Sequence, residues 1–172
     1  MSLARQNYLE ECEAGVNKHI NTELNASYIY SSMAFHFERD DVALPGFFKF
    51  FKKLSDRGRE RAEKFMKYQT KRGGRIILQD VKKPDHDEWG SGLDAMTTAL
   101  KLEKNINQAL LDLHKLAETK YDTHLDEFVE EEFLEEQVDS IKLIASYVTQ
   151  LTKAGPGLGE YLFDKETLQE SS

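Results

Sequence analysis

The sequence contains little cysteine, proline or glycine, and it has no long apolar run. Its single cysteine, Cys12, excludes a disulfide framework within the chain and a zinc site built from cysteines. Three prolines and ten glycines in 172 residues argue against a turn-rich all-β fold and against disorder. Because no apolar stretch approaches about 18 residues, we expect no membrane-spanning helix. The N-terminal residues MSLARQNYLEE lack the apolar core of a secretion signal, so a cytoplasmic location is expected.

The chain also has fewer basic than acidic residues. Its 23 Lys and Arg stand against 31 Asp and Glu, which gives a net charge of −8. An acidic protein is a poor partner for nucleic acid or for an anionic membrane surface, so neither partner is expected. A length of 172 residues suits one domain with a sizeable core. We therefore expect a single domain that covers residues 1–172.

Apolar residues recur at steps of three and four along most of the chain, which predicts an all-α fold. The first apolar stripe runs from Val16 through Ile20 to Phe37. Proline and glycine at residues 45–46 and 73–74 divide the pattern into separate helices. The predicted helices cover residues 10–37, 47–71, 93–119, 124–153 and 159–169.

A long irregular stretch, residues 75–92, connects the second and third predicted helices. A connection of this length is unusual within a domain, but it can travel the length of a helix bundle. We therefore expect a four-helix bundle over about residues 10–153, with the second and third helices parallel. The last helix, at about residues 159–169, is too short to be stable alone and needs a surface to dock on, such as other subunits.

Non-apolar residues interrupt the stripes near the middle of each long helix. Glu23, Glu103 and Gln137 lie on the first, third and fourth stripes, and Gly58 and Arg61 lie on the second. None of the five histidines is expected on a stripe. Because a carboxylate is costly to remove from water, the two glutamates need a cation or a basic partner.

Two interpretations of this cluster are open. Arg61 can bridge Glu23 and Glu103 as a structural ion pair, using the fixed donors of its guanidinium. Alternatively, the carboxylates hold a metal, as in bundles whose cores use Glu and Glu-x-x-His ligands. Charge favours the ion pair, because two carboxylates and a ferrous ion are already neutral before Arg61 is added. A misjudged helix phase is a third explanation.

The sequence resembles ferritin, most closely the animal heavy-chain type, over nearly all its length. The segments that carry the resemblance include RQNY (5–8), LNASYIY (24–30), RDDVALPGF (39–47), AEKFMKYQTKRGGRIILQDVKKP (62–84), LEKNINQALLDLHKLA (102–117) and GLGEYLFDKETL (157–168). The resemblance implies a hollow, octahedral shell of 24 subunits that takes up Fe²⁺ and stores iron as a ferric mineral. The last short helix would line the fourfold axis, with Leu158 and Leu162 facing the pore.

The ferroxidase centre of heavy chains carries over only in part. The residues that match its motif are Glu23, Tyr30, Glu103 and Gln137. Its bridging glutamate is replaced by Gly58, and the histidine one turn later by Arg61. Oxidation of Fe(II) by O₂ at such a centre needs two adjacent irons, so the resemblance implies an impaired, light-chain-like centre.

The function expected from this resemblance is iron storage and detoxification, with little or no ferroxidase activity in the chain itself. In a mixed shell, the chain would depend on catalytically complete heavy-type subunits. One alternative is a ferroxidase that still binds one iron at Glu23, Glu103 and Gln137 and oxidises it slowly. The other alternative is an iron-poor cage, natural or engineered.

The resemblance also implies two sets of carboxylates outside the centre. Threefold pores in ferritins are lined by acidic residues at the start of the fourth helix, and Asp126, Glu127 and Glu130 stand there in this sequence. Three copies would form a negative funnel for Fe²⁺ and other divalent cations. The alternative interpretation is a solvated acidic helix start, which the helix dipole favours.

The second set would help to nucleate mineral on the inner surface of the shell. Its members are Asp56, Glu60 and Glu63. They are interleaved with Arg57, Arg59 and Arg61, which weakens cation capture, so slower nucleation is expected. Ordinary surface pairing at i,i+3 and i,i+4 is an equal alternative for this segment.

Overall fold

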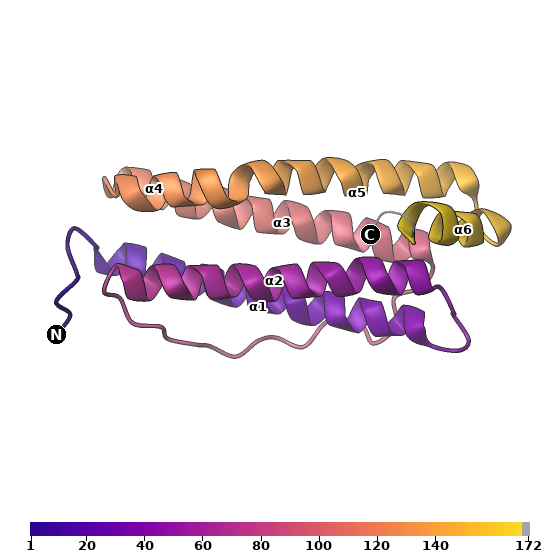
Figure 1. Cartoon of the computed structure of the whole chain (residues 1–172), viewed down its shortest axis with the longest axis horizontal. Coiled ribbons are helices and arrows are strands. Elements are labelled where there is room, and N and C mark those ends of the chain that lie inside the picture. Colours follow the sequence, from indigo (N-terminus) through magenta and orange to yellow (C-terminus); the bar gives the residue numbers. More distant parts are fainter. Residues whose placement is uncertain (170–172) are drawn as a thin grey trace.

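Four long rods of helix make up most of the chain in the computed structural model, which describes residues 1–169 (Figure 1). Their bounds are α1 Glu10–Glu38, α2 Pro45–Lys71, α3 Gly92–Thr119, and a fourth rod of α4 Thr123–Val129, the π-helical turn η1 Glu130–Leu134 and α5 Glu135–Ala154. The short segment after them consists of α6 Leu158–Leu162 and the π-helical η2 Phe163–Leu168. No strand occurs within residues 1–169, so the predicted all-α bundle is confirmed. Among the same residues, none of the helices combines the length and apolarity needed to cross a membrane.

Local sequence explains where the helices begin and end. α2 starts at Pro45, whose missing N–H and restricted φ suit a first helical turn. Ser91 caps α3: its hydroxyl accepts a hydrogen bond from the Asp94 N–H at 3.1 Å, and the Asp94 carboxylate accepts one from the Ser91 N–H at 3.0 Å. After α2, the chain turns at Gly73, whose φ of 81° is a conformation that favours glycine.

The crossover between α2 and α3 runs the length of the bundle, so that α2 and α3 point the same way, as predicted (Figure 1). A ladder of asparagines on α1 holds this crossover in place. Asn17 and Asn25 donate to the carbonyl oxygens of Arg75 and Lys82 at 3.0 and 3.1 Å, and Asn21 donates to two carbonyls between them. These asparagines are four residues apart and therefore lie on one face of the helix.

Aromatic rings fill the end of the bundle where α2 begins. Phe37 stacks between Phe47 and Phe51, with ring centroids 5.0 and 5.7 Å apart. Phe163 of η2 packs against the Phe47 ring at 5.8 Å, and Asp164 accepts a hydrogen bond from the Phe47 N–H at 2.8 Å. The short segment therefore docks on its own chain through η2.

The apolar residues of α6 are left exposed by this docking. Leu158, Tyr161 and Leu162 retain 71%, 52% and 45% of their accessible surface. That they line a fourfold axis stays a prediction, since only one chain is described.

Candidate metal centre

The polar residues predicted on the apolar stripes meet in the middle of the bundle. Glu23 of α1, Glu103 of α3 and Gln137 of α5 have no accessible surface, and Arg61 of α2 keeps 3%. Tyr30, also on α1, is fully buried beside them. Buried carboxylates require compensating charge or hydrogen bonds, so each glutamate must be followed to its partners.

Glu103 is fully paired, and its main partner is Arg57. The Arg57 Nη2 lies 2.7 Å from both carboxylate oxygens. The Tyr30 hydroxyl donates to Oε2 at 2.6 Å, the Ser140 hydroxyl donates to Oε1 at 2.8 Å, and the Gln137 Nε2 lies 3.2 Å from Oε1. Burial by itself would raise the pKa of Glu103, but the Arg57 charge and these hydrogen bonds outweigh it and hold the pKa below its ordinary value.

The expectation that Arg61 bridges both glutamates is wrong. Its Nη1 donates to the Gln137 Oε1 at 2.6 Å, and its Nη2 lies 3.1 Å from Oε1 of Glu136. The nearest oxygen of Glu23 is 3.9 Å from Nη1. Arg57 takes the place next to Glu103 instead. It lies one turn before Arg61 on the same side of α2, and its long side chain reaches inward from the flank of the helix.

Glu23 pairs with His19, a residue that the sequence pattern did not predict in the core. His19, expected off the stripe, is 2% exposed, and its Nε2 lies 2.9 Å from Oε2 of Glu23. Its ring packs on Phe65, with centroids 4.6 Å apart. The other carboxylate oxygen of Glu23 and the Nδ1 of His19 have no hydrogen-bond partner among the described residues. The i,i+4 spacing of His19 and Glu23 was the available signal, because it places both residues on one face of α1.

These residues do not fit a pair of iron ions. The two glutamates are balanced by Arg57 and Arg61, so the cluster is neutral before any cation enters. The helices are also close at Gly58, where a Cβ would lie 3.0 Å from the Glu23 carbonyl oxygen and 3.1 Å from the Ser27 nitrogen. Both charge and space therefore act against a second metal ligand at this point.

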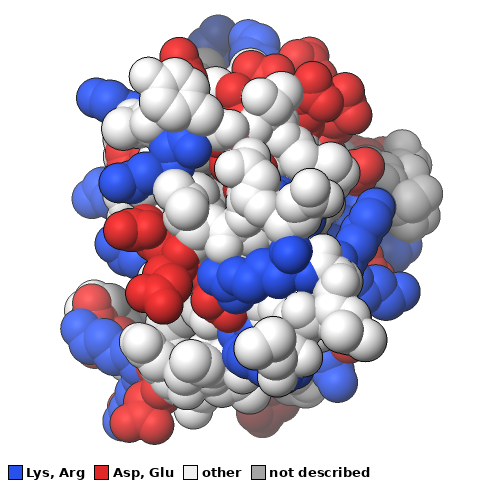
Figure 2. Space-filling view, turned by 90° about the vertical axis from the view of Figure 1, so that its left-hand side faces the viewer, with Lys and Arg blue, Asp and Glu red and all other residues white. Residues whose placement is uncertain are grey.

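A second cluster lies at the end of the bundle where α3 passes into α4. His114 Nε2 is 2.8 Å from Oε1 of Glu130 and also contacts the Asp126 carboxylate. The three ligand atoms lie within 4.8 Å of one another. Figure 2 looks onto this end, where acidic side chains gather along the upper edge and Lys and Arg side chains cross the middle. An imidazole with two carboxylates is a donor set that suits a divalent transition metal.

The sequence placed two of the three residues of this cluster and missed the third. Asp126 and Glu130 were expected at a pore, whereas Glu127, expected with them, is exposed and outside the group. His114 could not be found from spacing, because it lies on α3 and reaches the acidic residues only through the fold of the turn.

The proposed inner-surface carboxylates are not equivalent. Asp56 forms an ion pair with Lys52 at 2.6 Å, whereas Glu60 and Glu63 are exposed. Glu60 lines a groove of about 1030 Å³ between α2 and α5, together with Glu136 and Asp139. Arg57 lies on the wall of the same groove, and its side chain reaches from there to the buried Glu103.

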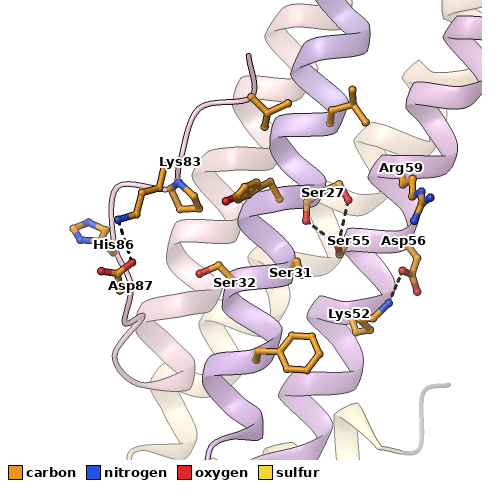
Figure 3. A pocket seen from close by; sticks show the side chains of 15 residues that line it. Ser27, Ser31, Ser32, Lys52, Ser55, Asp56, Arg59, Lys83, His86 and Asp87 are labelled. Carbon is orange, nitrogen blue, oxygen red and sulfur yellow. Dashed lines mark hydrogen bonds and ion pairs between the residues drawn. The ribbon is translucent and has the colours of Figure 1, made fainter. Parts of the chain in front are cut away.

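Another pocket, of about 770 Å³, lies between α1, α2 and the crossover (Figure 3). Serine hydroxyls line it, and the Ser55 hydroxyl donates to the Ser27 carbonyl at 2.7 Å, next to the close helix contact at Gly58. The charged residues on its rim pair with each other, as in the 3.7 Å contact of Lys83 with Asp87. Asp56 is the one predicted site residue among those that line this pocket, and nothing further is assigned to the pocket.

A four-helix bundle with one long crossover and inward-facing carboxylates defines a class of proteins that handle metals in the bundle core. The sequence matches the ferritin-like domain of the ferritin family over residues 13–154. It is 65% identical over 172 residues to the soma ferritin of Lymnaea stagnalis, covering 100% of this chain and 99% of that protein. It is 59% identical to the ferritin middle subunit of Aquarana catesbeiana (100% and 99% covered) and to the ferritin heavy chain of Echinococcus granulosus (98% and 98%). The chain belongs to the ferritin family. Its similarity to these ferritin subunits supports a function in iron storage in a ferritin shell.

Proposed function

We propose that this chain is a storage subunit of a ferritin shell and that its own bundle does not oxidise iron rapidly. The observation that carries the proposal is the pairing of Glu103 with Arg57 at 2.7 Å, with Arg61 as a second buried cation. An additional Fe²⁺ would bring excess positive charge into a buried site, which is unfavourable by about several kcal/mol. Iron is therefore cargo for this chain, entering as Fe²⁺ and stored as a ferric mineral in a 24-subunit octahedral shell in the cytoplasm.

The cluster of His114, Asp126 and Glu130 supports the part of the proposal that concerns iron entry. In the shell, three copies around a threefold axis would add their charges and raise the local concentration of cations. Glu127, exposed beside the cluster, would extend the negative funnel. Glu60 and Glu63 are the exposed carboxylates left to contact mineral on the inner face, since Lys52 neutralises Asp56.

Fast oxidation in this proposal comes from other subunits. In a mixed shell, complete heavy-type chains would oxidise Fe²⁺, and this chain would supply container wall, pores and mineral surface. In a shell made only of this chain, oxidation would proceed slowly on the growing mineral.

A slow ferroxidase with one iron is the second candidate, and one observation favours it. The Oε1 of Glu23 is buried and has no hydrogen-bond partner among the described residues, so it could accept a cation. Both oxygens of Glu103 are already occupied by Arg57, which leaves the proposed single iron with one free carboxylate oxygen. This donor set is weak for Fe²⁺, and the storage proposal is preferred.

Stopped-flow oxidation of Fe(II) in air, at about two Fe(II) per subunit, tests the proposal when assembly is first checked by light scattering. The purified chain is expected to form a large shell and to oxidise iron at nearly the rate of an iron-only control. A rapid initial burst would contradict the assignment of a blocked centre. A monomer or dimer at neutral pH would contradict the shell, and an assembled shell that retains no iron would point to an iron-poor cage.

A further inference from the structure

We propose that His36 is a pH-sensitive latch, which holds the last part of the crossover, residues 86–90, on α1 only while its imidazole is neutral. The inference is independent of iron and of the proposed function, since it concerns how the crossover is attached to the bundle. The latch gives the chain a local response to acid that precedes any unfolding of the helices.

The hydrogen bonds of His36 fix the protonation state of its ring. Its Nδ1 accepts a hydrogen bond from the backbone N–H of Trp89 at 3.4 Å, and its Nε2 lies 2.9 Å from the carbonyl oxygen of Gly90. Because a carbonyl oxygen can only accept, Nε2 carries the proton and Nδ1 offers the lone pair. A protonated ring has a donor at both nitrogens and would turn an N–H toward the Trp89 N–H, so both bonds form together only when the imidazole is neutral.

Trp89 is held on α1 at two points, and His36 supplies one of them. The indole Nε1 donates to the Ser32 hydroxyl at 3.0 Å, and Ser32 precedes His36 by one turn of the helix. Trp89 keeps 8% of its accessible surface, and His36 keeps 7%. In Figure 3, the Ser32 side chain points from α1 toward the crossover segment that carries His86. Loss of the bond to Nδ1 would leave the indole attached and release the backbone of Trp89 from α1.

The segment that His36 holds leads directly into α3. Gly90 has a φ of 73°, a left-handed conformation that favours glycine, and the next residue, Ser91, is the N-cap of α3. The capping bonds between Ser91 and Asp94 do not involve His36. The start of α3 is therefore fixed independently, and opening of the latch is confined to the crossover before it.

The electrostatic surroundings of His36 favour a positive charge, because carboxylates outnumber basic groups on the segments that meet there. Arg39 is already engaged with Asp41 and Glu88, at 2.6 and 2.9 Å. α2, whose first charged residue is Lys49, makes no hydrogen bond or ion pair with His36 within residues 1–169. The titratable groups on these segments are Glu38, Arg39, Asp40 and Asp41 at the end of α1 and just after it, His86, Asp87 and Glu88 of the crossover, Asp94 of α3 and Glu160 of α6.

The direction of the pH effect follows from which state can bind the proton. The closed latch requires the neutral ring, whereas the open latch accepts the charged ring beside its carboxylates. A fall in pH therefore shifts the population toward the open state, and a rise in pH closes it again. Histidine is the side chain that ordinarily changes charge between about pH 5 and pH 8, so the transition is expected in this range.

The fluorescence of Trp89, the single tryptophan of the chain, tests the latch in the purified full-length protein. Between about pH 8 and pH 5, the emission should shift to longer wavelength and quenching by acrylamide should increase at least about twofold, reversibly. His36→Gln is the decisive variant, because its amide has one acceptor and one donor and does not titrate. Its emission should stay constant over the same range. The latch is overturned if the unmodified chain shows no transition or if His36→Gln shows the same one.

His86 needs a control of its own, because its ring lies 5.8 Å from the Trp89 ring and a protonated imidazole can quench indole emission. The variant His86→Gln should keep the shift in wavelength and the gain in acrylamide quenching. Loss of both in this variant would assign the transition to His86 and overturn the latch.

Hydrogen exchange in the unmodified chain is a second test that requires no variant to fold. After correction for the intrinsic effect of pH, protection of the Trp89 amide should fall at least about tenfold between about pH 7.5 and pH 5.5. The Ala95 amide, which donates to the Ser91 carbonyl at 3.0 Å in α3, is the internal reference and should keep its protection. Equal loss at both amides, or a parallel loss of helical circular dichroism, would show general unfolding and overturn the latch.

Discussion

At the scale of single residues, the centre of the bundle is an ion-pair network in which two guanidinium groups balance two carboxylates. Arg57 neutralises Glu103, and the network continues through Tyr30 and Ser140. Burial raises the pKa of Tyr30 well above its ordinary value, and the Glu103 charge adds to this effect, so the tyrosine hydroxyl remains a donor. Breaking one member of such a buried network leaves an unpaired group, which is more destabilising than replacing the pair.

Restoring the two replaced ligands alone should not restore fast oxidation. In the double variant Gly58→Glu with Arg61→His, Arg57 still covers Glu103, and the new side chain meets the Glu23 carbonyl 3.0 Å from its Cβ. We expect stopped-flow Fe(II) oxidation to stay within about tenfold of the unmodified chain, a barrier change of about 1.4 kcal/mol. Adding Arg57→Gln to the double variant is the comparison. A fast double variant would show that Arg57 does not block the centre.

Acid should weaken the contribution of Glu103 to stability. Its pKa is below the ordinary 4.5 in the folded chain, so the folded state binds fewer protons than the unfolded one. The stabilisation is present above the unfolded pKa and is lost as the pH falls through the folded pKa. Glu103→Gln should therefore lower the free energy of unfolding by about 3 kcal/mol at neutral pH, and this difference should shrink as the pH falls below the ordinary carboxyl pKa of 4.5.

Urea unfolding of the two proteins across that pH range measures the effect. Glu60→Gln, which removes an exposed carboxylate from α2, serves as the control and should stay within about 0.5 kcal/mol of the unmodified chain. A difference for Glu103→Gln that stays constant into acid would contradict the lowered pKa.

At the scale of elements, the structure depends on how segments far apart in sequence are held together. The asparagine ladder on α1 holds the crossover along the bundle through hydrogen bonds to its carbonyl oxygens. The π-helical turn Glu130–Leu134 interrupts the fourth rod. It begins at Glu130 of the His114 cluster and ends three residues before Gln137. Insertions of this kind are frequent at functional positions in helices.

Asn17→Ala should loosen the first part of the crossover. The Asn17 side chain donates to the Arg75 carbonyl at 3.0 Å and accepts from the Ile77 N–H at 3.2 Å, and both bonds are exposed. Losing them should cost about 0.5–1.5 kcal/mol each at most and speed hydrogen exchange at residues 75–78. Lys18→Ala, on the exposed face one residue away, is the control. Unchanged exchange in the Asn17 variant would show that packing alone holds the crossover.

At the scale of the whole molecule, the fold places part of the net charge of −8 together on one surface, where it can attract cations. The acidic edge in Figure 2 lies at the end of the bundle that carries His114, Asp126 and Glu130. The exposed apolar face of α6 lies near the opposite end, beside the start of α3 (Figure 1). One end of the bundle thus presents an ionic surface, and the other end presents an apolar surface.

His114→Ala should remove one class of divalent-cation sites. Without the imidazole, Asp126 and Glu130 lose the nitrogen donor that favours transition metals over Mg²⁺ or Ca²⁺. Isothermal titration of the purified protein with Zn²⁺ should show at least about tenfold weaker binding at this cluster. His86→Ala, an exposed histidine on the crossover, is the matched control. Equal Zn²⁺ binding in both variants would remove His114 from the site.

The amino-acid sequence by itself determined the bundle, because the 3.6-residue periodicity and the breakers between helices are local properties. It also determined which carboxylates face inward, since Glu23 and Glu103 occupy positions of apolar stripes. The tertiary structure decided which basic group reaches each of them. Arg57 and Arg61 lie on one side of α2. The packing of the helices decides that Arg57 pairs with Glu103 and that Arg61 donates to Gln137. His114 meets Asp126 for the same reason: side chains from separate helices become neighbours only when the helices pack.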